Sequence, residues 1–368
     1  MLSQHRARQG PIRIQSQSQS QPCIDMRVAL SLAIMSLSQS LQSMVLTAGF
    51  CLTATFACGA APDPAQKPGA TRFAVLKYLH SISGKFTVSG IHNREPNRQP
   101  ALQTERLVTL VGKHPGLWSG DFLYSADDIK NRWTMIHECK KQWDQGAIVQ
   151  LMLHVAPPNQ PEACQWKGGL LSHLTDDQWK DLVTSGGQLN GVWKSRLDIY
   201  AQYLQYLKSN QVQVLFRPHH EMNQGNFWWG GRKGPEGTAK LYRLTHDYLT
   251  LQKGLTNLIW VWDMQDMSRD FKDYDPGERY WDIFAFDIYD NGYNPSWYEY
   301  ILTVVGNKPI AIGECKKLPS PKLLATQPRW CFFMSWAELT FNHNSNQQIQ
   351  DLYQAARVIT RDKLPKFK

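Results

Sequence analysis

The chain has 368 residues, of which 42% are hydrophobic, and its formal net charge is +9 at pH 7. This length can bury one large core or at most two modest ones. The basic residues are scattered, without a Lys/Arg run or a basic stripe, so the charge indicates a solvated basic surface and not a nucleic-acid-binding protein. The 14 Trp, 14 Tyr and 14 Phe supply flat rings of the kind that stack on sugar faces, although core packing is the commoner role of any single ring.

Residues 1–61 differ in composition from the rest of the chain. They open with a Gln/Ser-rich segment and reach an apolar run, Val45–Ala57, that ends in small residues. This layout predicts a disordered leader followed by a signal peptide. We therefore expect a secreted or periplasmic protein, with lipid attachment through Cys58 as the alternative, because residues 55–58 resemble a lipoprotein cleavage box. Residues 62–70 are rich in proline and are predicted to be a linker.

From residue 71 to residue 368, short apolar or β-branched runs alternate with amphipathic stretches. This alternation predicts a single (β/α)8 TIM barrel with eight parallel strands. A doubly wound open sheet is less favoured, because no Gly-rich phosphate turn follows the first strand. The predicted strands are Lys85–Ile91, Gly116–Phe122, Ala147–His154, Val212–Pro218, Leu258–Asp263, Ile283–Tyr289, Pro309–Glu314 and Trp330–Trp336.

Apolar residues at helical spacing predict two of the outer helices. One stripe runs from Leu197 to Leu207 and a second from Leu241 to Leu251, and each is expected to face the core. Thr238 and Gly254 are expected to cap and to stop the second of these helices. Ser296 with Glu299 predicts a capping box for the next one.

Four cysteines follow the predicted leader. They form no Cys-x-x-Cys or Cys/His zinc spacing, so a metal ribbon or redox motif is not indicated. Disulfide pairing and free buried thiols both remain open for Cys139, Cys164, Cys315 and Cys331.

Polar residues gather at the predicted carboxyl ends of the strands, where the chemistry of a β/α barrel takes place. Two carboxylates stand out: Glu221 lies just past the fourth strand, and Glu314 ends the seventh. These two ends face each other across the barrel mouth. The other polar or aromatic residues at strand ends are His92, Asn93, Asp121, His154, Arg217, His219, His220, Asn223, Asp263, Asp287, Tyr289 and Trp336.

A pair of carboxyl groups about 5–5.5 Å apart is what a retaining glycosidase requires, one as acid/base and the other as nucleophile. Glu221 precedes the aromatic residues 227–229, which would desolvate it and raise its pKa. Glu314 precedes Lys316 and Lys317, whose charge would favour the ionised form. The sequence therefore predicts Glu221 as the acid/base and Glu314 as the nucleophile.

Three segments resemble glycoside hydrolase family 26, whose members are mostly endo-β-1,4-mannanases. Residues 216–223 (FRPHHEMN), followed by 227–230 (FWWG), are similar to the acid/base segment of that family. Residues 286–289 (FDIY) and 312–314 (IGE) are similar to its FD-x-Y and nucleophile strands. The resemblance extends over most of residues 70–360 and implies a retaining barrel enzyme with its glutamates on strands four and seven.

The resemblance also implies supporting roles. Tyr289 would hold the nucleophile by a hydrogen bond, Asp287 would support this shell, and Trp336 would be the stacking floor beneath the sugar. One departure is Asn226, which stands where many members have a Trp. This departure places the contact to the leaving group in doubt, and Phe227 or Trp166 could replace it. The other residues expected to bind substrate or support the site are His154, His220, Trp228 and Arg217.

The leading hypothesis is thus a retaining endo-β-1,4-mannanase acting on mannan or glucomannan as a monomer, without cofactor or metal. The same mechanism on β-1,3-xylan or mixed-linkage glucan, or a mannobiose-releasing exo-enzyme, are alternatives. Two further hypotheses come from other classes. One is a non-catalytic sugar-binding barrel, and the other is a metal-dependent hydrolase with the ligands His154, His219, His220 and Asp287.

Overall fold

The structure is a computed structural model that describes residues 72–367. The predicted leader (1–61), with its signal peptide and Cys58, and the predicted linker (62–70) lie outside the described residues. The alternation seen in the sequence does fold into a barrel, in which eight parallel strands lie in the order of the chain and β1 pairs with both β8 and β2. The predicted (β/α)8 class is confirmed.

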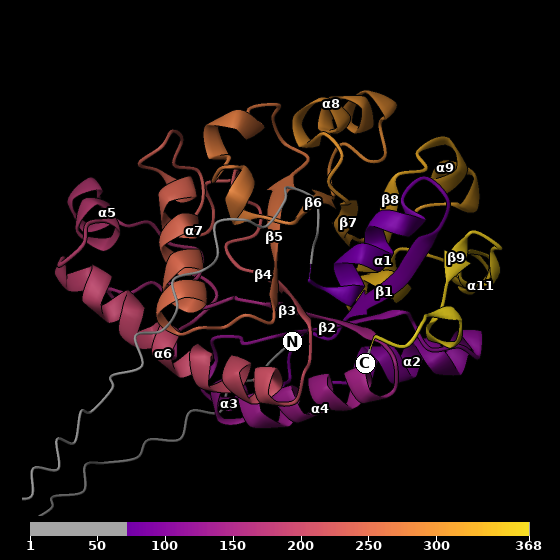
Figure 1. Cartoon of the computed structure of the whole chain (residues 1–368), viewed down its shortest axis with the longest axis horizontal. Coiled ribbons are helices and arrows are strands. Elements are labelled where there is room, and N and C mark those ends of the chain that lie inside the picture. The colour runs from indigo at the N-terminus through magenta and orange to yellow at the C-terminus, as the bar shows by residue number, and fades with distance from the viewer. Residues whose placement is uncertain (1–71, 368) are drawn as a thin grey trace, which may run out of the picture. The chain divides into compact units, whose positions relative to one another are not determined.

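Each of the eight predicted strands exists, and its ends lie within two residues of the predicted ones. A short ninth strand pairs with the first residues of β1. All nine are buried along nearly their whole length, because helices cover the outside of the sheet and side chains fill the inside (Figure 1). The strands are β1 (Thr87–His92), β2 (Leu117–Asp121), β3 (Ile148–Met152), β4 (Val214–Arg217), β5 (Leu258–Gln265), β6 (Ile283–Ile288), β7 (Ile310–Cys315), β8 (Trp330–Ser335) and β9 (Val358–Ile359).

The helices form the outer ring of the barrel (Figure 1). Short turns η1 (Tyr248–Gln252), η2 (Phe271–Tyr274), η3 (Glu278–Tyr280) and η4 (Arg361–Lys363) accompany them. The α-helices are α1 (Ala74–Ile82), α2 (Leu102–Val111), α3 (Ala126–Lys130), α4 (Arg132–Asp144), α5 (Asp176–Val183), α6 (Gln188–Ser209), α7 (Thr238–Asp247), α8 (Pro295–Val305), α9 (Pro321–Thr326), α10 (Leu339–Asn342) and α11 (Asn346–Gln354).

The first predicted helical stripe is confirmed, and the second is wrong at its end. Helix α6 buries its stripe from Leu197 to Leu207. In the second stripe Leu241 is buried, whereas Leu251 is 67% exposed. The reason is that α7 continues into the π-helical turn η1, which widens the helix and rotates its last residues away from the core. Gly254, with φ +64°, follows this turn as the predicted stop.

Two predicted helix caps are wrong. The residue that caps α7 is Gly237, while Thr238 is the first helical residue and donates its hydroxyl hydrogen to the carbonyl of Trp229. Helix α8 begins at Pro295, and its cap is Asn294, whose side chain accepts from the backbone N–H of Ser296. Proline is favoured at the first helical position because it has no N–H to satisfy, and this places the start of the helix ahead of the predicted capping box.

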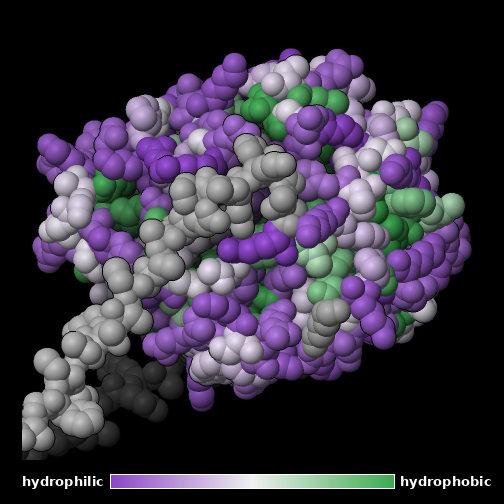
Figure 2. All heavy atoms as spheres, in the orientation of Figure 1, coloured by the Kyte–Doolittle hydropathy of each residue, from purple (hydrophilic) through white to green (hydrophobic). Residues whose placement is uncertain are grey.

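The four cysteines are free thiols in the structure, so the disulfide alternative is not realised within residues 72–367. Cys139, Cys315 and Cys331 are buried, and Cys164 is half-buried. The face drawn in Figure 2 is mostly hydrophilic, with hydrophobic side chains in small separate groups. Within the described part of the chain, no helix combines the length and apolarity needed to span a bilayer.

Candidate active site

A cleft of about 640 Å³ opens at the carboxyl ends of the strands. It contains both predicted catalytic glutamates and four of the predicted supporting residues, while Arg217, Asp287 and Trp228 lie outside its lining. The lining residues are Arg94, Glu95, Leu123, Tyr124, His154, Trp166, Leu171, His220, Glu221, Gln224, Asn226, Phe227, Tyr289, Glu314 and Trp336.

The two glutamates lie close together although 93 positions separate them in the sequence. Their exposed fractions are 6% for Glu221 and 3% for Glu314. One carboxylate oxygen from each of Glu221, Asp287 and Glu314 lies within 4.8 Å of the other two. Retaining glycosidases hold their two carboxyl groups about 5–5.5 Å apart, and inverting ones about 6.5–9.5 Å apart. The spacing in this cleft therefore lies closer to the retaining range than to the inverting one.

A strained turn after β4 presents Glu221 to the cleft. Its φ is +51° and that of His219 is +50°, a region that non-glycine residues adopt only when their surroundings hold them there. The hold comes from β5, where the Oδ1 of Asp263 accepts the backbone N–H of Glu221 at 2.7 Å. Gln224, three residues further on, donates its amide hydrogen to Glu221 Oε2. The sequence analysis assigned no role to Asp263 or Gln224.

A buried guanidinium organises the carboxylates beneath the cleft floor. Arg217, at the end of β4, is completely buried. Its NH1 donates to Asp263 Oδ2 at 2.6 Å and to both oxygens of Asp287 at 3.0 Å, and its NH2 donates to Glu314 Oε1. The packing is so close that a Cβ on Gly313 would meet Asp263 Oδ2 at 2.6 Å. Only glycine fits before Glu314, which gives the Gly-Glu pair of the seventh strand a physical reason.

The nucleophile candidate is held at both carboxylate oxygens. Arg217 binds Oε1, and the hydroxyl of Tyr289 donates to Oε2 at 2.7 Å. Tyr289 follows β6 directly, and its own N–H is accepted by Asp266 Oδ1 at 3.2 Å. The structure thus places Tyr289 where the sequence analysis expected it, next to Glu314.

The two glutamates differ in their electrostatic surroundings. Burial raises the pKa of Glu221 well above its ordinary value, and the nearby Glu314 and Asp263 raise it further. Burial also raises the pKa of Glu314, but Arg217 and the Tyr289 hydroxyl oppose this shift by stabilising the carboxylate. The asymmetry has the predicted direction. The predicted cause of the stabilised Glu314 carboxylate was wrong. The main stabilising cation is Arg217, which is far from Glu314 in the sequence but contacts it in the structure, and not Lys316 or Lys317.

A second buried network lies at the ends of β2 and β3. Asp121 is fully buried, and its Oδ2 lies 2.5 Å from Nδ1 of His154, while its Oδ1 accepts the His154 backbone N–H at 3.0 Å. His92 Nε2 lies 3.9 Å from the same carboxylate. Burial lowers the pKa of His92 to about 3, so this ring is neutral. It stacks under Trp336 with ring centroids 4.3 Å apart and an interplanar angle of 18°.

His220 joins this network to the acid/base segment. It is buried, and its ring lies 4.3 Å from that of His154. Burial lowers the pKa of His220 well below its ordinary value. A neutral imidazole therefore lies beside Glu221, where it adds no positive charge that would favour ionisation of this candidate acid/base.

The family to which the chain belongs follows from a match that covers most of its length. The family model described as "Glycosyl hydrolase family 26" matches residues 64–363. The chain is a member of glycosyl hydrolase family 26. The predicted resemblance is confirmed.

The chain is also similar to proteins named mannan endo-1,4-β-mannosidase. A mannan endo-1,4-β-mannosidase of Thermothelomyces thermophilus is 30% identical over 305 residues, which are 79% of this chain and 61% of that protein. One of Bacillus subtilis strain 168 is 33% identical over 230 residues, covering 58% of this chain and 60% of that protein. The chain thus spans about 60% of the length of these relatives.

Solved structures share the fold at higher coverage. GH26A from Muricauda sp. MAR_2010_75 is 33% identical with a TM-score of 0.75, covering 79% of this chain and 96% of that one. A β-mannanase from a symbiotic protist of the termite Reticulitermes speratus, solved with gluco-manno-oligosaccharide, is 25% identical with a TM-score of 0.71, covering 81% and 96%.

In this family 26 chain, the loop after β4 separates residues that line the cleft from residues that support it. Phe227 lines the cleft and stacks on Trp229 with centroids 4.5 Å apart. Trp228 is buried, and its Nε1 donates to the carbonyl of Val155 at 2.8 Å. The predicted Trp228 is therefore a loop support and not a ring on the cleft surface. Trp166, which is 42% exposed, reaches Phe227 from the loop after β3 with centroids 5.7 Å apart.

The ligand set of the metal hypothesis is not assembled. His219 Nε2 lies 3.0 Å from Thr245 Oγ1, and its ring packs against Trp193 behind the cleft. Within residues 72–367, the one group of three possible metal-binding side chains is Glu221, Asp287 and Glu314. Arg217 already supplies positive charge to two of these three carboxylates, which does not fit a cation there.

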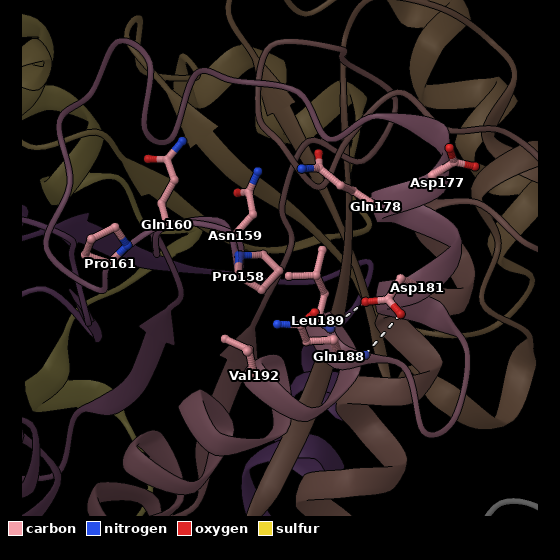
Figure 3. Close-up of a pocket in the computed structure, with 10 residues that line it drawn as sticks. All are labelled: Pro158, Asn159, Gln160, Pro161, Asp177, Gln178, Asp181, Gln188, Leu189 and Val192. Atoms are coloured by element: carbon pink, nitrogen blue, oxygen red, sulfur yellow. Dashed lines mark hydrogen bonds between the residues drawn. The ribbon is translucent and has the colours of Figure 1, made fainter.

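A second hollow, of about 620 Å³, lies between the loop after β3 and helices α5 and α6 (Figure 3). Its Asp181 points to the start of α6, where it accepts the backbone N–H groups of Gln188 and Leu189 at 3.0 and 2.6 Å. This carboxylate is therefore used to cap a helix. No aromatic ring is among the residues that line the hollow, and we assign it no chemistry.

Proposed function

We propose that this protein is a retaining, endo-acting glycoside hydrolase that cleaves β-1,4-mannosidic bonds in mannan-type polysaccharides by double displacement. The observation that carries the proposal is the pair Glu221 and Glu314, whose carboxylates lie within 4.8 Å in the cleft. Burial raises the pKa of Glu221, whereas Arg217 and Tyr289 stabilise the carboxylate form of Glu314. This is the pair that a retaining mechanism uses.

In the first step, a carboxylate oxygen of Glu314 attacks the anomeric carbon. The carboxylic proton of Glu221 passes to the glycosidic oxygen, the bond to the leaving chain breaks, and a glycosyl ester on Glu314 forms. Burial raises the pKa of Glu221 and so favours the protonated form that donates this proton. Arg217 and Tyr289 orient the attacking carboxylate through its two oxygens.

In the second step, Glu221 acts as a base. It takes a proton from a water molecule whose oxygen attacks the anomeric carbon, and the ester bond to Glu314 breaks. Glu221 regains its proton and Glu314 its charge, so the site returns to its starting state. Two inversions at the same carbon leave the product with the configuration of the substrate.

The choice of substrate is supported by the relatives, which are named mannan endo-1,4-β-mannosidases. In the cleft, the ring of Trp166 is exposed, that of Trp336 is half-buried and that of Phe227 is buried. Such rings suit the flat C–H faces of β-linked hexoses. We further propose that the protein acts as a monomer, since one chain supplies the complete cleft, and that it is exported by the signal peptide predicted in residues 1–61. Sedimentation and N-terminal sequencing of the secreted product test these two points.

The decisive experiment incubates the purified protein with galactomannan, glucomannan, β-1,3-xylan and lichenan, and sizes the products over time. Long products at early times from the two mannans are expected, whereas a single dimer from the start indicates an exo-enzyme. Proton NMR of the first product is expected to show the β-anomer. Glu314→Ala is expected to abolish turnover, and azide is expected to partly restore Glu221→Ala on a substrate with a labile leaving group. Normal activity of both variants on mannan would contradict the assignment.

A further inference from the structure

Two tryptophans of this chain are exposed, and only one of them belongs to the cleft. All 14 Trp lie within residues 72–367, and the exposed large hydrophobic side chains among those residues include just two of them, Trp133 and Trp166, each 42% exposed. Trp166 lines the cleft. Trp133 lies on α4, on the outside of the barrel. Single exposed hydrophobic side chains are common on protein surfaces, whereas a contiguous exposed group of them marks a binding surface.

Trp133 belongs to an aromatic group, which we call the Trp133 cluster: Trp133 and His137 of α4, both exposed, with Tyr203 and Tyr206 of α6. The ring centroid of Trp133 lies 4.7 Å from that of Tyr203, 5.5 Å from that of Tyr206 and 5.6 Å from that of His137. Helices α4 and α6 pack against each other along the lower edge of the barrel in Figure 1. These contacts fix the indole in place, so little conformational entropy is lost when a ligand stacks on it.

The Trp133 cluster also offers hydrogen-bonding groups. Tyr203 and Tyr206 are half-buried, and within the described residues neither hydroxyl has a hydrogen-bond partner. The amide side chains of Gln202 and Gln205 are exposed on the same helix. Tyrosine hydroxyls and amides can both donate and accept hydrogen bonds, which is what a ligand covered with hydroxyl groups requires.

Two cations that act on the tyrosines of the cluster are each paired with a carboxylate. Lys140, whose charge acts on Tyr206, pairs with Asp144 at 2.5 Å. Arg132, whose charge acts on Tyr203, is buried and pairs with Glu162. With these two cations paired, the aromatic and polar groups of the cluster complement an uncharged ligand better than an acidic or basic one.

We propose that the Trp133 cluster is a second carbohydrate-binding surface, which holds an uncharged β-1,4-linked mannan chain outside the catalytic cleft. This inference rests on the proposed function, since it gives the surface the polymer that the cleft would cleave. Attachment at a second point raises the effective concentration of enzyme on insoluble substrate without changing the chemistry at Glu221 and Glu314.

The test uses the full-length protein and the variant Trp133→Ala, with Phe86→Ala as the matched control, since Phe86 is 41% exposed and is not part of the cluster. Adsorption to insoluble β-mannan is measured in the cold, and turnover of soluble mannotetraose is measured in parallel. For Trp133→Ala we expect adsorption to fall by about three- to tenfold, the size of one aromatic stacking contact, with unchanged turnover of the soluble substrate. Phe86→Ala is expected to match the wild type in both assays.

Three results would overturn the inference. The first is equal adsorption of Trp133→Ala and wild type, and the second is an equal loss in Phe86→Ala. The third is a wild-type dimer that Trp133→Ala converts to a monomer, because the cluster is then a contact between two copies of the chain. Failure of the proposed function is a separate outcome: Trp133-dependent adsorption without any hydrolysis of mannan supports the binding surface and refutes the catalytic proposal.

Discussion

The hydrogen bond from Tyr289 to Glu314 allows a quantitative prediction. The phenolic hydroxyl donates to Oε2 of Glu314 at 2.7 Å, and Tyr289→Phe removes this donor while keeping the ring. A hydrogen bond to an ionised group contributes about 1.5–3 kcal/mol. Because each 1.36 kcal/mol is a factor of ten in rate, we expect kcat/KM to fall by about 10- to 150-fold.

The same substitution has a predictable effect on the pH profile. The hydroxyl stabilises the carboxylate form of Glu314, so it lowers the pKa of a group that burial raises. Without the donor that pKa is higher, and at a given acidic pH less of the enzyme carries an ionised nucleophile. The acidic limb of kcat/KM is therefore expected to move toward higher pH, while the alkaline limb, which reports on Glu221, is expected to change less.

The assay measures initial rates on a soluble aryl β-mannobioside across the acidic and neutral range. Tyr353→Phe is the matched control, because Tyr353 is also buried but donates to the carbonyl of Gly90 at 3.3 Å, away from both glutamates. The control is expected to keep the wild-type profile. If Tyr289→Phe keeps kcat/KM within about twofold of wild type and the acidic limb stays in place, the hydrogen bond does not support the nucleophile and the reasoning fails.

Three further substitutions test the surrounding networks. Asp121→Asn removes the carboxylate that contacts Nδ1 of His154. We expect the folded variant to have a kcat/KM at least about tenfold lower than the wild type. Wild-type kinetics would show that His154 needs no such partner. Arg217→Met leaves three buried carboxylates without their cation. Denaturant titration should give a free energy of unfolding lower by about 3–5 kcal/mol, and a change below about 1 kcal/mol would be incompatible with the network. Gln224→Met removes a donor that lowers the pKa of Glu221, so the alkaline limb of kcat/KM should move to higher pH, and movement to lower pH would rule out this interaction.

The sequence alone was sufficient to predict the barrel and the proximity of its two candidate catalytic glutamates. Apolar runs and helical stripes are local patterns, and burial on both faces of each strand follows from them. Once eight strands are placed in order, barrel closure brings the ends of the fourth and seventh together. Glu221 and Glu314 could therefore be paired before any distance was known, because both stand at strand ends.

The partners of this pair were decided only by the tertiary structure. Arg217 binds Glu314 across the barrel floor, yet the sequence analysis attributed the charge on Glu314 to its neighbours Lys316 and Lys317. Asp121 reaches His154 from the adjacent strand, and Trp228 turns away from the cleft toward Val155. Electrostatic interactions act over distances through space, and a side chain's direction is fixed by what it packs against. The spacing of residues along the chain specifies neither the distances between charged groups nor the directions of side chains. These contacts therefore appear only when the barrel closes.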